Sequence, residues 1–322
     1  MESNHARWTF EFYKPEYQVL SCDGRMPQRV ICFPLDYFMA DIRKLVVDEK
    51  IIRKLTDDET ELLDRIYREV HSILRPEINR YCLEVRASNI GEGVKMAYIP
   101  ISALRLYKRG SVGISLFVLP KERMAAPLPP LSFMQSHPGS PIYSMGKEEV
   151  KTFKQLCNRL NELSSLEDQK LGLALRRYNL SFSVPEFEDK LIDYMIALEA
   201  LFLSGESEKG FRLRTYMTTF LGNNSPSRMQ EIWNYVKKAY ELRSQVVHGT
   251  KPLPSKISVR GLDYIVSIED FVFKIEEYTR DAIKRYIEIK AKSKDFNLQN
   301  FVERALYRPY EKTETTLTRE KV

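Results

Sequence analysis

Residues 225–249, SPSRMQEIWNYVKKAYELRSQVVHG, carry the signals of a complete helix from beginning to end. Ser225 is typical of an N-cap, and Pro226 is tolerated in the first turn because an N–H there has no intrahelical partner. Gly249 stands where a residue with a left-handed backbone ends many helices. The stretch therefore predicts a long helix from Pro226 to His248, in a part of the chain built from packed helices.

Helical periodicity continues on both sides of this stretch. We expect further helices over about 147–163, 186–203, 211–221 and 267–292, the last opened by Ser267 and Asp270. The apolar run LIDYMIALEALFL, 191–203, is shorter than the roughly 20 residues that span a bilayer, so it predicts a core helix. Residues 146–294 are thus predicted to form an all-α helical bundle, and 295–322 a tail with one short helix.

The first 119 residues show a different pattern. Aromatic and β-branched residues alternate with polar ones over 8–34, and the turn signal Asp23-Gly24 predicts an opening hairpin. The segments 80–88, 94–102 and 111–119 predict further strands. Thr56 and Glu59 form a capping box that opens a predicted helix over 56–74. We expect an α+β domain over 1–119.

A proline-rich stretch separates these two parts. Six prolines lie between Pro120 and Pro141, with few periodic apolar residues among them. Because proline removes a backbone donor and fixes φ, this composition disfavours regular structure. We expect residues 120–145 to be a linker.

Composition narrows the class of protein. The 322 residues are 43% hydrophobic and 29% charged, and the net charge of +6 permits an anionic partner without requiring one. The cysteines, Cys22, Cys32, Cys82 and Cys157, have neither C-x-x-C spacing nor a nearby histidine, which argues against a metal site and against a disulfide framework. With no glycine-rich phosphate loop and no signal-peptide pattern, we expect no cofactor, no membrane association and a cytoplasmic protein.

Arg243 and His248 are the candidate functional pair on the 226–248 helix. Ile232, Val236, Ala239 and Val246 mark the buried face of this helix, and Arg243 lies within about 40° of its centre. A guanidinium there needs a carboxylate, a phosphate or a wet cleft, since an unpaired buried charge costs several kcal/mol. One interpretation is that Glu199 pairs with Arg243 while His248 only caps the helix. The other is a catalytic site, because an imidazole exchanges protons near neutral pH.

Three ordered segments resemble a known family. RRYNLSFSVPEFEDKLIDYMIALEALFL, GFRLRTYMTTFLG and YELRSQVVHG are together similar to the HEPN superfamily, and most closely to its Apea-like HEPN branch. The resemblance covers residues 170–250 and extends to about 292. It implies a helical bundle that forms a homodimer, with the R-x(4 to 6)-H motifs of two subunits in one cleft. Many such domains are metal-independent endoribonucleases, often in toxins and antiviral defence.

The resemblance places the motif arginine at Arg243 and its histidine at His248. Ser244 follows the arginine where Asn, Asp or His is frequent in the superfamily, and the acidic residue of the LE element falls on Glu199. We include Tyr240 as a supporting residue. In the resulting hypothesis His248 exchanges the proton of the 2′-OH or of the leaving 5′-oxygen, and Arg243 stabilises the charge on the phosphate.

RNA is therefore the expected partner. Four basic residues would hold its backbone by phosphate contacts, unless they are simply a solvated face: Arg212, Arg214, Lys237 and Lys238. The alternative function is a non-catalytic HEPN module that binds nucleic acid, nucleotide or a protein partner in the same cleft without turnover.

Overall fold

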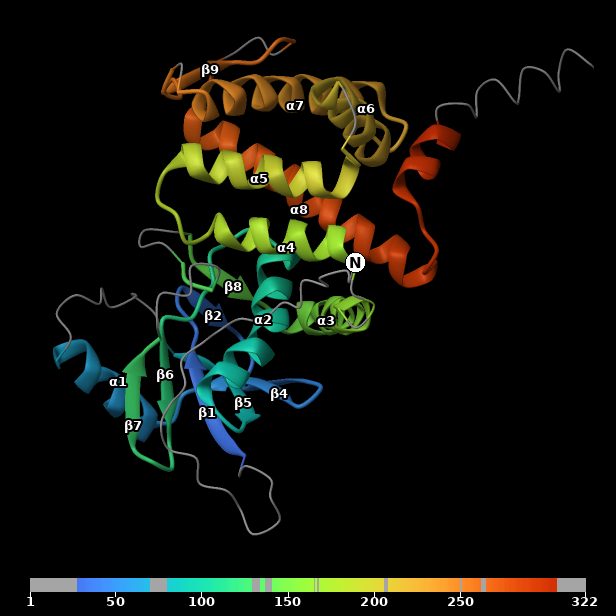
Figure 1. Ribbon diagram of the computed structural model, residues 1–322. Helices are drawn as coiled ribbons and strands as arrows, with labels where there is room; N and C mark the ends of the chain where they lie inside the picture. The colour runs from blue at the N-terminus through green and yellow to red at the C-terminus, as the bar shows by residue number, and fades with distance from the viewer. Residues whose placement is uncertain are drawn as a thin grey trace, which may run out of the picture.

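The computed structural model describes residues 28–69, 80–128, 134–136, 141–164, 166, 168–205, 208–249, 251–261 and 265–305. Among the described residues, all the strands of the six-stranded sheet come before residue 128 and helices predominate after residue 146, so the expected order of an α+β part followed by a helical part is present (Figure 1). That the helical part is HEPN-like stays a prediction. No helix among the described residues has the length and apolar character needed to cross a membrane.

The N-terminal part is built on an antiparallel sheet of six strands in the order β3-β4-β5-β1-β6-β7. Their bounds are β1 Arg29–Pro34, β3 Lys44–Val47, β4 Lys50–Lys54, β5 Tyr81–Ala87, β6 Leu116–Leu119 and β7 Met124–Pro127. The central strand β1 pairs with β5 along its whole length, from Arg29 opposite Ala87 to Pro34 opposite Cys82. The strand predictions over 80–88 and 111–119 are therefore confirmed, whereas the turn Asp23-Gly24 lies outside the described residues.

Two helices cover the two faces of this sheet. Helix α1, Asp57–Glu69, packs Leu62 and Leu63 against a small apolar cluster on one face. Its expected capping box is present, because Thr56 N–H donates to Glu59 and Glu59 N–H donates to the Thr56 hydroxyl. Helix α2, Ile90–Tyr107, covers the other face so closely that a Cβ at Gly93 would lie 2.9 Å from Ile31 Cδ1.

Helix α2 corrects the prediction of a strand over 94–102. Asn89 caps the helix by accepting a bond from Glu92 N–H at 2.9 Å. The helix is buried on most of its surface, between the sheet and the helical part, so its apolar residues do not follow a clean 3.6-residue period. The alternation of apolar and polar residues over 94–102 therefore wrongly indicates a strand, whereas the cap formed by Asn89 with Glu92 correctly marks the start of a helix.

The expectation that 120–145 lacks regular structure is also wrong in part. Strand β7 pairs with β6, and β8, Tyr143–Met145, pairs in parallel with β2, Phe38–Ala40. Pro127 is accommodated because it ends an edge strand, where a missing N–H leaves no ladder bond unmade. The division of the chain into domains stays a prediction, and the main cluster of buried side chains runs from Ile31 to Val302 through both parts.

In the C-terminal part, α4, α5 and α7 are stacked above α2, and α3 lies beside α2 (Figure 1). The bounds are α3 Val150–Ser164 after the 3₁₀ turn Lys147–Glu149, α4 Gln169–Leu180, α5 Phe187–Phe202, α6 Lys209–Leu221, α7 Pro226–Val247 and α8 Ile268–Lys292. These bounds confirm the helices expected over 147–163, 186–203, 211–221, 226–248 and 267–292, and residues 298–305 form the expected short helix. Helix α4, capped by Asp168, and the hairpin of β9, Lys256–Ser258, with β10, Ile265–Ser267, were not expected.

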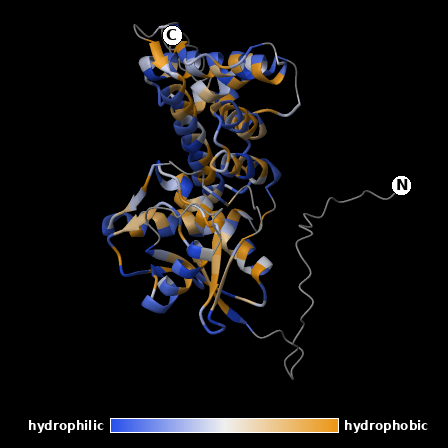
Figure 2. Cartoon of the chain, turned by 90° about the vertical axis from the view of Figure 1, so that its left-hand side faces the viewer, coloured by the Kyte–Doolittle hydropathy of each residue, from blue (hydrophilic) through white to orange (hydrophobic). Residues whose placement is uncertain are grey.

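Apolar residues concentrate inside both parts (Figure 2). Helix α5 lies at the centre of the helical stack, in contact with α4, α6, α7 and α8. Its side chains Leu191, Met195, Ala197 and Leu198 are completely buried. Because α7 packs on α5, the polar residues of their contact are held in fixed positions relative to each other.

Candidate functional site on helix α7

Helix α7 has the ends that its sequence predicts. Pro226 stands at the first turn after the N-cap residue Ser225, and Gly249 has a φ of +63° just beyond the last turn. His248 is the C-cap, and its backbone N–H donates to the Ser244 carbonyl oxygen at 3.1 Å. The imidazole is thus fixed to the very end of the helix by the position of its backbone.

Arg243 faces α5, as its place on the helix predicts. Its Nη2 lies 3.7 Å from Glu199 Oε2, and the two side chains keep 24% and 19% of their surfaces exposed. The expectation that Arg243 needs a partner, with Glu199 as the obvious carboxylate, is confirmed. Most of the expected buried stripe is present, since Ile232, Val236 and Ala239 are fully buried, but its fourth member, Val246, is only partly buried.

The pair between Arg243 and Glu199 is incomplete. At 3.7 Å the two groups attract each other as charges but are too far apart for a good hydrogen bond. Arg243 Nε and Glu199 Oε1 are both buried and have no hydrogen-bond partner among the described residues. Buried donors and acceptors without partners are costly, and such groups recur at functional sites.

His248 lies at the exposed end of α7, next to Val247, whose side chain is 50% exposed. On an ideal helix it points about 140° away from Arg243. Within one chain the structure therefore brings Arg243 to Glu199 and leaves His248 facing outward. Ser244 is partly exposed on the same turn, and its role in orienting the imidazole stays a prediction.

Tyr240 lies where α6 begins beside α7. A Cβ added to Gly210 would stand 2.9 Å from Tyr240 Cδ1, so the two helices approach closely at this glycine. The ring of Tyr240 is partly buried against the main core. Its position one turn before Arg243 supports the packing of α7, and a direct part in chemistry stays a prediction.

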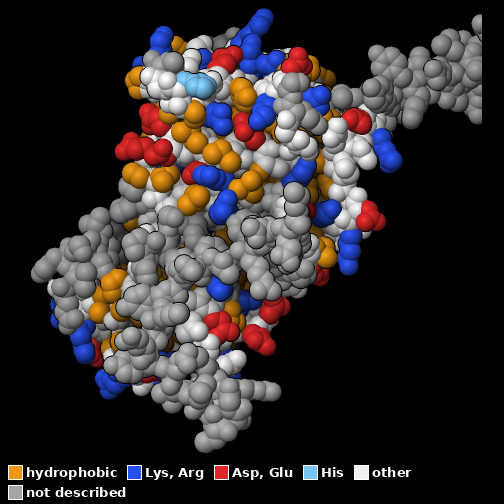
Figure 3. All heavy atoms as spheres, in the orientation of Figure 1, with side chains coloured by type: hydrophobic (Ala, Val, Ile, Leu, Met, Phe, Trp, Pro, Cys, Tyr) orange, Lys and Arg blue, Asp and Glu red, His pale blue; other side chains and the backbone are white. Residues whose placement is uncertain are grey.

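The four basic residues proposed for RNA divide into two groups. Arg214 on α6 lies 4.7 Å from the centre of the Trp233 ring, and Arg212, two residues earlier on the same helix, is partly buried. Lys237 and Lys238 on α7 both approach Glu241, at 4.0 and 3.9 Å. On the face drawn in Figure 3, Lys and Arg side chains are scattered among apolar ones over the helical part. Their contact with RNA stays a prediction.

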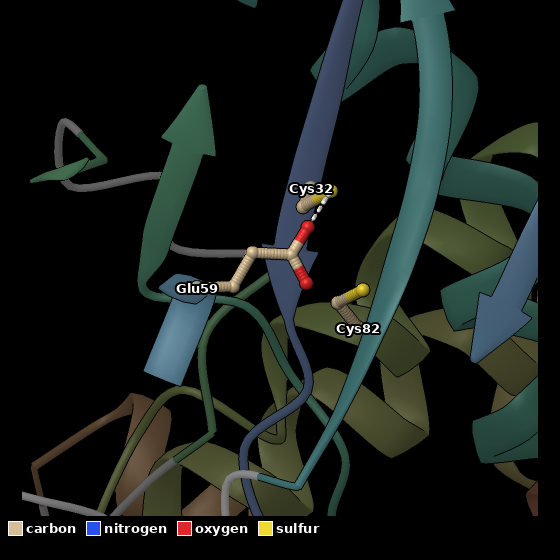
Figure 4. Close-up of side chains that lie close together, drawn as sticks. All are labelled: Cys32, Glu59 and Cys82. Carbon is tan, nitrogen blue, oxygen red and sulfur yellow. Dashed lines mark hydrogen bonds between the residues drawn. The ribbon is translucent and has the colours of Figure 1, made fainter. Parts of the chain in front are cut away.

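Sequence reasoning missed a polar cluster in the sheet. Cys32 on β1, Cys82 on β5 and Glu59 on α1 are buried, and their potential ligand atoms lie within 4.8 Å of one another (Figure 4). The Cys32 thiol lies 3.3 Å from Glu59 Oε1 and donates to it. Spacing along the chain could not reveal this group, because 27 and 23 residues separate its members and only the sheet brings them together.

Arg53 already supplies the cation of this cluster. Its guanidinium donates to both Glu59 oxygens, at 2.7 and 2.8 Å, and to Glu84 at 2.6 Å. A hydrogen bond with Cys82 and burial raise the pKa of the Cys32 thiol, so it stays protonated. A metal ion would have to displace the guanidinium and deprotonate the thiols. The cluster therefore fits a charge network that ties α1 to the sheet better than it fits a metal centre.

Fold and site together define an α+β sheet part joined to a helical stack whose long helix α7 exposes a terminal histidine and half-buries an arginine. No family model, curated protein or solved structure matches the chain.

Proposed function

We propose that the protein is an endoribonuclease that cleaves RNA by attack of the 2′-OH, with Arg243 and His248 as its catalytic residues. The observation that carries the proposal is the incomplete pair of Arg243 with Glu199. The Arg243 guanidinium lies 3.7 Å from Glu199 without a hydrogen bond between them, and its Nε has no partner among the described residues, so it can donate to a phosphate oxygen without first breaking a strong ion pair. The sequence resemblance to HEPN ribonucleases supports the same residues.

The chemistry needs only a base, an acid and a cation. His248 takes the proton of the 2′-OH as this oxygen attacks the phosphorus, and the bond from phosphorus to the 5′-oxygen breaks. A second imidazole gives a proton to that leaving oxygen. Arg243 donates to the equatorial oxygens, where negative charge increases in the transition state. The products are a 2′,3′-cyclic phosphate and a 5′-OH, and DNA is spared because it lacks the 2′-OH.

A second copy of the chain completes the site in this proposal. Arg243 and His248 diverge by about 140° around α7, so one chain does not place both beside a single phosphate from the same side. In a twofold dimer each α7 supplies an imidazole opposite the other, which provides the base and the acid. Light scattering of the purified protein measures the dimer directly, and a strictly monomeric, active enzyme would contradict this arrangement.

The experiment compares the wild type with His248→Ala, Arg243→Lys and, as a control, Lys292→Ala at the exposed end of α8. Substrates are a labelled RNA and the DNA of the same sequence, with and without EDTA. We expect the wild type and the control to cleave RNA at the same rate and to leave cyclic phosphate ends. Arg243→Lys should cleave about 100-fold more slowly, because lysine lacks the forked donor geometry, and His248→Ala should not cleave. Cleavage of DNA, inhibition by EDTA or equal rates for all four proteins would refute the proposal.

A second candidate is a non-catalytic module that binds a partner through the α7 surface. The contact of Arg243 with an internal carboxylate and the exposure of His248 both favour it, since neither residue then needs to touch a substrate. It predicts that the wild type and the His248→Ala and Arg243→Lys variants behave alike in every cleavage assay. The strength of the Arg243–Glu199 pair discriminates between the two candidates.

A further inference from the structure

Phe211, Arg214 and Trp233 form a cluster where α6 packs on α7, which we term the aromatic platform. The ring centroids of Phe211 and Trp233 lie 5.8 Å apart at an interplanar angle of 86°. The Arg214 guanidinium lies 5.2 Å from the first ring and 4.7 Å from the second. Phe211 is 50% exposed, so much of a large ring faces solvent beside a cation.

Within the part of the chain that the structure describes, no carboxylate neutralises the charge of the platform. Among the described residues Arg214 has no carboxylate partner, and its buried Nε has no hydrogen-bond partner. One turn along α7 from Trp233, Lys237 shares Glu241 with Lys238, so a single carboxylate faces two ammonium groups. This surface therefore complements an anionic partner that also presents flat rings.

A line of accessible side chains leads from the platform to the end of α7. Five residues point within about 40° of the direction of Trp233 on an ideal helix and so form this line: Trp233, Lys237, Tyr240, Ser244 and Val247. All five are partly or largely exposed. The line ends beside His248, about 22 Å along the helix from Trp233 at 1.5 Å per residue. A strand of a few nucleotides covers such a distance.

We propose that the aromatic platform and this line of α7 bind single-stranded RNA, with bases stacked on Phe211 and Trp233 and phosphates held by Arg214 and Lys237. The inference rests on the proposed function, because it names the class of RNA that is led to His248. Single strands are favoured over duplexes because stacking on a side chain needs a base face that the duplex covers. Stacking is sequence-tolerant, so the platform selects unpaired RNA and not a particular sequence.

The test measures binding of a fluorescein-labelled single-stranded RNA of about twelve nucleotides, and of its duplex, to the full chain. His248→Ala serves as the background, so that no cleavage disturbs the equilibrium. To it are added Phe211→Ala, the conservative Phe211→Tyr, and Met39→Ala as a matched exposed apolar residue in the N-terminal part. We expect Phe211→Ala to raise the Kd for the single strand about tenfold, and the other two to leave it unchanged.

The duplex should bind more weakly than the single strand, and only the single strand should quench Trp233 fluorescence, measured with Trp8→Phe in all proteins. Equal affinity of Phe211→Ala and its parent would overturn the inference. The inference would also be overturned if Phe211→Ala changed the oligomeric state but not the RNA affinity, because the platform would then be a protein interface. Melting temperatures verify that Phe211→Ala remains folded.

The outcomes separate this inference from the nuclease proposal. If the wild type cleaves RNA and Phe211→Ala changes neither the cleavage rate nor the affinity, the nuclease proposal stands and the inference on the platform is wrong. If binding depends on Phe211 but the wild type cleaves no RNA, the inference on the platform stands and the nuclease proposal is wrong. If no form of the protein binds single-stranded RNA, the inference on the platform is wrong, and the cleavage assay alone decides the nuclease proposal.

Discussion

At Arg53 a single guanidinium holds two carboxylates, Glu59 and Glu84, at the edge of a buried pair of thiols. Burial alone would raise the pKa of Glu59, but the hydrogen bonds from Arg53 and Thr56 hold it below the usual 4.5. The folded state therefore binds the Glu59 proton less tightly than the unfolded chain does. Ionised Glu59 contributes stability above pH 4.5, and this contribution is lost as the pH falls through the lower, folded pKa.

We expect Glu59→Gln to lower the free energy of unfolding by about 3 kcal/mol at neutral pH, because it leaves Arg53 short of a buried partner. The variant should also lose less stability than the wild type between about pH 5 and pH 3, since it lacks this titrating group. Urea denaturation at both pH values measures the effect. Glu61→Gln, on the exposed side of the same helix, is the control and should resemble the wild type.

The strength of the Arg243–Glu199 pair is a second prediction at the scale of the residue. A double-mutant cycle with Glu199→Gln and Arg243→Gln isolates their interaction. We expect a coupling below about 1 kcal/mol, since the charged atoms stand 3.7 Å apart without a hydrogen bond and are partly exposed. A coupling near about 3 kcal/mol would mean that Arg243 is committed to Glu199. That result would favour the non-catalytic candidate.

The sequence could predict which arginine needs a partner, but not how well the partner fits. The position of Arg243 on the buried side of α7 follows from helix periodicity, and Glu199 on the apolar 191–203 helix is the candidate carboxylate. Their distance depends on how α5 packs on α7, which no local pattern encodes. The same reason explains why the cluster of Cys32, Glu59 and Cys82 was missed, since strand order brings the two cysteines together and the packing of α1 on the sheet adds Glu59.

At the scale of the element, the end of α7 depends on Gly249. Its φ of +63° disfavours any residue with a Cβ, although no atom stands within 4 Å of the place where that Cβ would be. Gly249→Ala should therefore cost about 1 kcal/mol through backbone strain alone. Gly172, exposed inside α4 with equally open space, has no such φ. Gly172→Ala should instead stabilise the protein by about 0.5 kcal/mol.

Both values come from chemical denaturation of the single variants. The two variants should change the free energy of unfolding in opposite directions. An error in the wild-type value shifts both changes by the same amount, so it does not affect their difference. Stabilisation by Gly249→Ala would show that α7 does not end in a left-handed residue. His248 would then be displaced from the position on which the proposed function depends.

Elements with strong end signals were predictable, and those whose character comes from tertiary context were not. Helices α1 and α8 have side-chain caps and a polar face, and α7 has Pro226 in its first turn and Gly249 beyond its last, although the Ser225 side chain makes no capping bond. Helix α2 is enclosed between the sheet and α3, α4 and α8, and its local alternation resembles a strand. Strand β7 contains a proline and exposes much of its surface, and only its pairing with β6 makes it a strand. For such segments the partner decides the structure.

At the scale of the whole molecule, Arg105 joins the two parts. It ends α2 fully buried and donates to the carbonyl oxygens of Val112, Met134, Gln135 and Asn179, the last in α4. Tyr178, also in α4, donates in return to the Arg105 carbonyl oxygen at 3.0 Å. Removing the guanidinium leaves several buried acceptors unpaired, which is costlier than losing one bond. The junction between sheet and helices thus depends strongly on one side chain.

Because the buried core runs through both parts and Arg105 links them, we expect the chain to unfold in one transition. Fluorescence of Trp233, with Trp8→Phe, reports on the helices, and alkylation of Cys82, read by peptide mass spectrometry, reports on the sheet. Both should give the same midpoint in urea. Arg105→Leu should lower the free energy of unfolding by about 3 kcal/mol, and the two probes should report the same decrease. Arg86→Leu, at an exposed position, should leave both midpoints unchanged. Two separate midpoints would instead show that residues 1–119 and 146–294 fold as independent domains, because a shared core cannot unfold in one part and persist in the other.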